Sequence, residues 1–148
     1  GRPPVVDLAR ERALGELLAA LGRDGLAGSA HDLADGGLAQ ALAESALRYG
    51  VGARLFLGDD PFTALFSESA GRVVVTTSDP AAVRTAAERA GVPVTELGTT
   101  GGAALAVDGL VDLPLEELRA AWTATLPALF GTPEATVGSV PAGTVPTS

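Results

Sequence analysis

The sequence predicts one mixed β-sheet covered by helices, and three observations support this prediction. Segments with helical periodicity alternate with short apolar segments bounded by turn residues, as in proteins whose strands are joined by helices. Two strand-like segments then follow each other around a Thr-Thr-Gly-Gly turn at 99–102, which indicates an antiparallel hairpin rather than a purely parallel sheet. The 148 residues fit one domain, and 47% of them are hydrophobic, enough for a packed core.

The composition narrows the possible functions. The net charge is −8 at pH 7, which argues against a nucleic acid partner because phosphates would be repelled. All ten basic residues are arginines, so this sequence holds neither the lysine of a P-loop nor a Schiff-base lysine. Cysteine is absent, which rules out disulfides and thiolate zinc sites and is compatible with a cytoplasmic location. No apolar run reaches the roughly 18 residues of a membrane span, so no membrane partner is expected.

The N-terminal part predicts a linker, a helix and a strand. The Arg-Pro-Pro run at 2–4 is extended by proline geometry, and Asp7 is a suitable N-cap for a helix over 7–21. Gly22 ends this helix, and residues 25–33 are short and apolar enough for a buried strand. The buried stripe of the helix has apolar residues at helical spacing: Leu14, Leu17, Leu18 and Leu21.

Two more helices follow, separated by a short strand. The first comes directly after a Gly-Gly pair and ends at Gly50, a residue suited to a C-cap. Residues 53–57 alternate as a strand does, and a short helix over 61–68 begins with Pro61 after two aspartates. The inner face of the first of these helices comprises Leu38, Ala41, Leu42, Ser45 and Ala46.

The next segments give the clearest strand and the expected hairpin. Three consecutive valines mark a strand over 72–77. Asp79 then caps a helix that runs to Ala90, and Gly91 ends it. Residues 92–97 and 103–107 form the two predicted strands that flank the turn.

The last predicted helix begins after Leu113-Pro114, and Pro127 is expected to kink or end it. From Gly131 onward Gly, Pro, Ser, Thr and Val occur without periodicity, which predicts a flexible tail. The inner face of the helix comprises Leu118, Ala121, Trp122, Thr125 and Leu126.

The run Asp35-Gly36-Gly37 at a helix start has two interpretations. Glycines allow a phosphate to approach the backbone, and the free N–H groups of a helix start favour a negative charge. In the structural interpretation, Asp35 itself is the N-cap and no ligand is needed. Asp35 would also repel a phosphate unless magnesium or donor groups of the ligand intervene.

His31 is the only histidine and is followed by Asp32. The pair is a possible general base with its orienting carboxylate, but adjacent strand residues point to opposite faces. A lone histidine beside a strand end is more often a hydrogen-bonded structural residue, and we favour that interpretation. A metal site made by His31, Asp32 and Asp35 is a third possibility.

A second polar stretch, at 66–72, lies between the short helix and the valine strand. Glu68 and Arg72 are candidates for holding a ligand hydroxyl and a phosphate. In the favoured structural interpretation, Glu68 and Ser69 complete the helix end and Arg72 forms an ion pair. We assign no catalytic residue and no metal ligand. The predicted substrate- or phosphate-binding residues are Asp35, Gly36, Gly37, Glu68, Ser69 and Arg72.

The stretches at 30–38 and 65–72, in this order, resemble the C-terminal domain of the aminoimidazole ribonucleotide synthetase superfamily, and the resemblance covers about 3–130. It implies an α+β, three-layer α/β/α fold with a mixed sheet. The expected division is a linker from a missing upstream domain at 1–6, the synthetase C-terminal-type domain at 7–130 and a flexible tail at 131–148.

Within the superfamily, the start of the chain and the Trp122 helix with its finish at 126–131 are most similar to the last domain of the phosphoribosylformylglycinamidine synthases. These ligases form an amidine from formylglycinamide ribonucleotide, glutamine-derived ammonia and ATP in purine biosynthesis. The resemblance implies ATP and Mg²⁺ bound mainly outside this fragment. It also implies a glutaminase subunit, a small accessory subunit and upstream domains of the same chain as partners, and an inactive isolated fragment.

Three alternatives stay open beside this interpretation. Ala70 stands where the first half of such a synthase has glutamine, so this half supports an auxiliary nucleotide site or only the pseudo-symmetric assembly. The chain is otherwise a domain of a related phosphotransferase, such as thiamine-monophosphate kinase or aminoimidazole ribonucleotide synthetase itself. The last alternative is a structural or docking domain without a ligand.

Overall fold

The computed structural model describes residues 6–131, without the side chains of 126–128. The predicted linker and tail therefore lie, apart from Val6 and Gly131, outside the described residues. In chain order the elements are α1 (Leu8–Arg23), β1 (Ser29–Asp32), α2 (Gly37–Tyr49), β2 (Ala53–Leu55), α3 (Pro61–Phe66), β3 (Val73–Thr76), α4 (Pro80–Ala90), β4 (Gly98–Thr100), β5 (Ala104–Val107), β6 (Val111–Pro114) and α5 (Leu115–Phe130).

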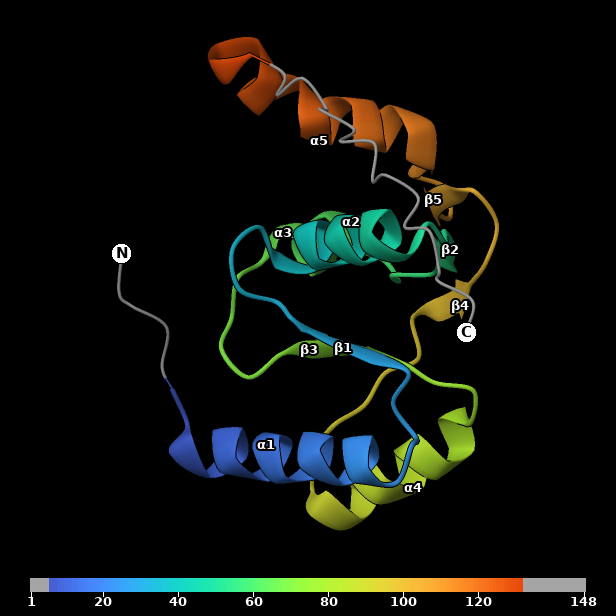
Figure 1. Ribbon diagram of the computed structural model, residues 1–148. Coiled ribbons are helices and arrows are strands. Elements are labelled where there is room, and N and C mark those ends of the chain that lie inside the picture. The colour runs from blue at the N-terminus through green and yellow to red at the C-terminus, as the bar shows by residue number, and fades with distance from the viewer. Residues whose placement is uncertain (1–5, 132–148) are drawn as a thin grey trace, which may run out of the picture.

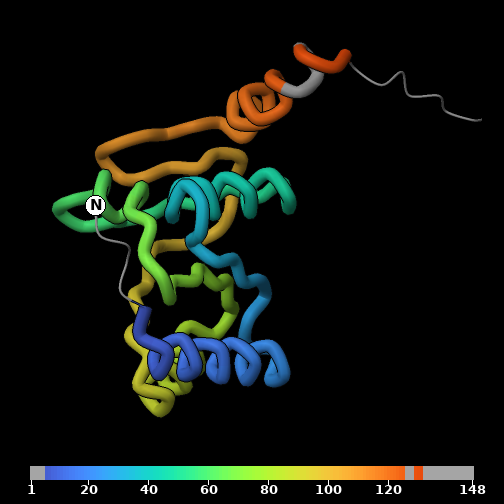
Figure 2. Tube along the Cα trace, turned by 90° about the vertical axis from the view of Figure 1, so that its left-hand side faces the viewer, coloured from blue at the N-terminus to red at the C-terminus, as the bar shows by residue number. Residues whose placement is uncertain are grey.

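The elements stack in layers (Figure 1). Helices α1 and α4 form one outer layer, and strands β1 and β3 cross the middle. Helices α2 and α3 cover the opposite side, and α5 lies beyond α2, as Figure 2 also shows. No helix in the described part of the chain is long and apolar enough to cross a membrane.

The strands form two hydrogen-bonded sheets, so the prediction of a single sheet is wrong. Strands β1 and β3 pair antiparallel along their whole length, from Ser29 opposite Thr76 to Asp32 opposite Val73. The other sheet has the order β4-β2-β5-β6. It is mixed, as predicted, because β2 runs parallel to β5 while the other two pairs are antiparallel.

The hairpin predicted around 99–102 does not form. Strand β2 lies between β4 and β5 and pairs with both. Gly52 fits there because a Cβ would collide with the Ala104 backbone. Residues 92–97 form no strand, since Pro93 has no N–H to donate to a ladder.

A different hairpin joins β5 and β6. Leu110 N–H donates to the Val107 carbonyl at 3.0 Å and closes the turn. From the sequence, residues 113–114 are expected only to lead into the last helix, whereas they form the end of β6. Pro114 is tolerated because it ends an edge strand, where no partner needs its missing N–H.

Aspartate caps fix most helix starts as predicted. Asp7, Asp60 and Asp79 each accept a hydrogen bond from a backbone N–H of the first turn of α1, α3 and α4. Such a cap stabilises a helix by about 0.5–2 kcal/mol. Helix α2 differs from these three helices, because its N-cap is Gly36 and no side chain caps it. The short helix α3 ends at Phe66, two residues earlier than predicted.

The buried residues form two separate cores. The first lies between α2, α3 and the four-stranded sheet, and the second lies between α1 and α4. The buried members of the first core are Leu33, Leu38, Ala41, Leu42, Leu55, Leu65 and Val107. The members of the second are Leu17, Leu21, Val83 and Ala87.

Helix α5 does not pack as predicted. Leu118 is half-buried, but Ala121, Trp122 and Thr125 of the expected inner face are exposed. Leu126 is outside the described side chains. The helix continues past Pro127 to Phe130 and therefore does not end at the proline. The contact that ties it to α2 is a hydrogen bond of 2.8 Å from the Arg119 guanidinium to the Leu47 carbonyl.

Candidate functional site

The two polar stretches singled out in the sequence meet at one edge of the molecule. The loop from β1 to α2 and the loop from α3 to β3 lie side by side there, on the left in Figure 1. Gly36 N–H donates to Glu68 Oε1 at 2.8 Å, which joins groups 32 residues apart in sequence. We call these residues, 33–37 and 67–72, the motif edge.

At the two glycines of the motif edge, an added Cβ would meet different neighbours. Both have positive φ, 78° at Gly36 and 64° at Gly37. A Cβ on Gly37 would lie 2.7 Å from the Leu65 carbonyl oxygen and 3.0 Å from that of Ser67. The close approach of α2 to the end of α3 therefore requires Gly37. At Gly36, beside the positive φ, a Cβ would lie 2.7 Å from the Gln40 Cβ of α2 itself.

Asp35 does not cap α2, so the structural interpretation of this residue is wrong. The helix begins one residue later than that interpretation needs, with Gly36 as N-cap. Asp35 is exposed, and within the described residues its carboxylate accepts no hydrogen bond. Glu68 instead accepts from the N–H of Gly36, the residue before the helix, and its carboxylate provides the negative charge that a helix N-terminus favours.

Arg72 holds the end of α3. Its guanidinium donates to the carbonyl and the hydroxyl of Ser67, at 3.1 and 3.0 Å, and to the Ala64 carbonyl at 3.4 Å. A cation beside the last carbonyls of a helix is favourable. The predicted ion pair is wrong, because all three acceptors are neutral. Glu68 and Ser69 are exposed, and neither ends the helix.

His31 links β1 to α2. Its Nδ1 donates to the Asp32 carbonyl at 2.7 Å, and its Nε2 lies 2.9 Å from Glu44 Oε2. Gln40 donates to the other Glu44 oxygen at 2.9 Å. Because both ring nitrogens face acceptors, the protonated imidazolium suits this place and no lone pair is free for general-base work.

The charges around His31 support the same assignment. The hydrogen bond to the Asp32 carbonyl raises the pKa of His31, and Glu44 raises it further against the opposing effect of burial. Hydrogen bonds from Gln40 and His31 lower the pKa of Glu44. The Asp32 carboxylate is only a loose neighbour, 3.8 Å from Nδ1. The described residues contain no group of three or more His, Asp or Glu placed to hold a metal.

The comparisons with known proteins identify the family. Residues 1–108 match the family model described as AIR synthase related protein, C-terminal domain. The chain belongs to this family. This AIR synthase-related domain resembles Thermotoga maritima PurL complexed with ATP, with a TM-score of 0.70 and 24% identity over 77% of this chain and 22% of that one. The likeness confirms the predicted three-layer α+β fold.

Curated relatives are more similar in sequence. The domain is 59% identical to phosphoribosylformylglycinamidine synthase subunit PurL of Nocardioides sp. over 135 residues, which are 88% of this chain and 17% of the relative. It is 53% identical to the PurL subunit of Frankia casuarinae, with 88% and 18% covered. The domain therefore spans less than a fifth of the length of these relatives.

The structure thus gathers the six predicted site residues at the motif edge, although it links them differently from the prediction. Gly36 contacts Glu68, while Arg72 contacts α3 rather than either of them. Sequence reasoning missed Ser67, the partner of Arg72, and Glu44, the partner of His31. The one signal for Glu44 in the sequence was its position four residues after Gln40, on the same helix face.

Proposed function

We propose that this domain is the last domain of a phosphoribosylformylglycinamidine synthase, an ATP-dependent C–N ligase of purine biosynthesis. The carrying observation is the 59% identity to a PurL subunit over 88% of the chain. The proposed reaction joins ammonia, released from glutamine, to formylglycinamide ribonucleotide. It forms formylglycinamidine ribonucleotide while ATP becomes ADP and phosphate.

In this proposal, the motif edge is one wall of a cleft completed by upstream domains of the same polypeptide. Asp35, Glu68 and Ser69 are exposed there, next to the start of α2. Exposed carboxylates can accept hydrogen bonds from ligand hydroxyls. Arg72 and the two glycines fix the loops that present these groups, and a ligand phosphate would approach the backbone at Gly36 and Gly37.

ATP and Mg²⁺ are proposed as cofactors of the whole enzyme, bound mainly outside this domain. Solved relatives include T. maritima PurL complexed with ATP, ADP and AMPPCP. The described residues offer no group of three or more acidic or histidine side chains for a metal. The domain alone is proposed to be inactive.

The proposed partners are a glutaminase subunit and a small accessory subunit, with the cytoplasm as the location. One solved structure similar to this chain is named PurLQS from T. maritima. This name supports further subunits beside PurL in that assembly. Exposed apolar side chains support contact with other parts of such an assembly, notably Trp122, Leu129 and Phe130 of α5.

A structural or docking role is the second candidate, and one observation favours it. Gly36 N–H and the Arg72 guanidinium, two groups that the sequence predicts to bind a ligand, already have partners within the domain. In this alternative, the motif edge only shapes the fold. A related phosphotransferase stays the alternative within the superfamily.

The experiment uses the full-length protein that contains this domain and measures ammonia-dependent ADP formation. Glu68→Ala and Asp35→Ala should lower the activity, whereas Glu88→Ala, an exposed glutamate of α4, should not. Glu68→Gln retains an oxygen for Gly36 and separates loss of charge from loss of the loop contact. Full activity of all these variants would leave the docking role in place.

A further inference from the structure

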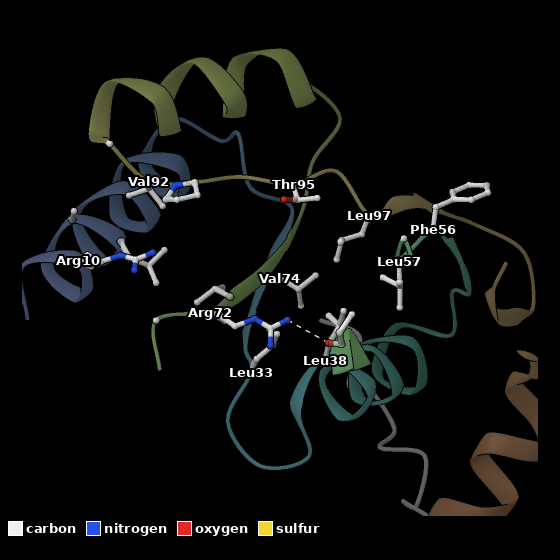
Figure 3. Close-up of a pocket in the computed structure, with 18 of the residues that line it drawn as sticks. Arg10, Leu33, Leu38, Phe56, Leu57, Arg72, Val74, Val92, Thr95 and Leu97 are labelled. Atoms are coloured by element: carbon white, nitrogen blue, oxygen red, sulfur yellow. Dashed lines mark hydrogen bonds between the residues drawn. The ribbon is translucent and has the colours of Figure 1, made fainter. Parts of the chain in front are cut away.

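A cavity of about 740 Å³ lies between the two cores of the domain. Figure 3 shows it between the α1–α4 layer and the side of α2. Val74 packs against the first core and Val92 against the second, and both line the cavity. The space remains because the sheet between these helices consists of only two short strands, β1 and β3, which do not fill it.

The walls are mainly apolar, and their charged groups are all of one sign. Leu14, Leu38 and Leu97 are typical of the lining. The charged residues of the described lining are Arg10, from the first turns of α1, and Arg72. No aspartate or glutamate is among them. Two cations without an acid are unusual in a chain with a net charge of −8.

Neither guanidinium is neutralised by a carboxylate in the described part of the chain. Arg72 is held by the neutral oxygens of Ser67 and Ala64, one contact being dashed in Figure 3. Arg10 extends from α1 toward the cavity in the same view. Glu11 lies at the rim, since its Oε1 would be 2.8 Å from a Cβ built on Gly71, but it does not line the cavity.

We propose that this cavity binds a small organic anion, in which a carboxylate or phosphate is attached to an apolar body. The guanidinium of Arg10, assisted by the field of Arg72, holds the anionic end. The leucine and valine walls take up the apolar end. The volume falls within the range of about 300–1,000 Å³ typical of small-molecule sites. The cavity shares Leu33, Gly71 and Arg72 with the motif edge, but neither Gly36 nor Glu68 lines it, and binding of an anion there does not depend on the ligase activity.

The test is a titration of the 148-residue chain followed by amide NMR spectra. The probes are naphthyl phosphate, naphthoate and the neutral naphthalenemethanol. We expect saturable shifts at Ala13, Val74 and Leu97 with one or both anions, and much weaker binding of the neutral probe. The ranking of the two anions identifies the preferred charged group.

Three variants make the test specific. Arg10→Ala should weaken anion binding about tenfold, the effect of one charge-assisted contact, while Arg23→Ala at the other end of α1 should not. Ala13→Trp should abolish binding by filling the cavity. Arg10 is exposed, so its removal leaves the fold intact, which the same spectra check. Equal binding of the neutral probe, equal effects of the two arginine variants, or no saturable shift would overturn the proposal.

Discussion

Helices α2 and α5 both carry apolar residues at helical spacing, but their apolar faces have different surroundings. Leu38 of α2 is 2% exposed and lies in the first core, whereas Trp122 of α5 is 51% exposed. The same kind of pattern thus correctly predicted a buried face in one helix and failed in the other. Helical periodicity shows that a face needs a partner, but it does not show whether this chain provides that partner.

The largest expected effect is loss of a buried side chain from α2. Leu38→Ala should lower the free energy of unfolding by roughly 2–5 kcal/mol, because it leaves a cavity in the first core. Urea unfolding followed by circular dichroism measures this change. A loss below about 1 kcal/mol, the size expected for a surface position, would show that α2 is not packed as described.

The start of α2 gives the next largest effect. Gly37→Ala should destabilise the domain, since φ is 64° and the new methyl group would lie 2.7 Å from the Leu65 carbonyl oxygen. Gly109→Ala is the matched control, with φ at 69° and nothing within 4 Å of the added Cβ. The control should lose about 1–2 kcal/mol for the backbone alone. Equal losses in the two variants would contradict the close packing of α2 on α3.

The His31–Glu44 contact should make the attachment of α2 depend on pH. The raised pKa of His31 means that its contribution is complete below its ordinary pKa and is lost as the pH rises through the folded-state value. The lowered pKa of Glu44 adds a contribution that is lost in acid. Because the pair is partly exposed, we expect at most about 1 kcal/mol.

Unfolding curves measured from about pH 5 to 9 test this expectation. The wild-type domain should lose stability relative to His31→Gln as the pH rises above the ordinary pKa of histidine, about 6.5. Glu44→Gln should reduce the difference. A difference between wild type and His31→Gln that does not change with pH would show that folding leaves the pKa of His31 unchanged, so that the contact with Glu44 does not stabilise the imidazolium.

Sequence patterns predicted the local elements better than the pairing of strands. Asp79 and Gly91 marked both ends of α4 because caps act through neighbouring backbone groups. The partner of β4 is β2, which lies more than forty residues earlier, so no local pattern at 99–102 could indicate this pairing. The motif residues could likewise be selected from their local patterns. The Gly36–Glu68 contact could not be predicted, because it joins residues 32 apart in the sequence.

The smallest effect on stability, and the sharpest test of the comparison, is expected at Trp122. Because this side chain is half exposed, Trp122→Ser should change the free energy of unfolding by no more than about 0.5 kcal/mol.

The apolar neighbours of Trp122 at the end of α5, Leu129 and Phe130, are 71% and 82% exposed, so the isolated domain should self-associate through this helix. Sedimentation velocity should show a concentration-dependent increase in the sedimentation coefficient for the wild type and a smaller one for the variant. The exposed Phe62 of α3 offers a matched control, since Phe62→Ser removes an aromatic side chain from another surface and should leave the association unchanged. A wild-type domain that stays monomeric at all concentrations would mean that an exposed amphipathic face is tolerated here without any partner.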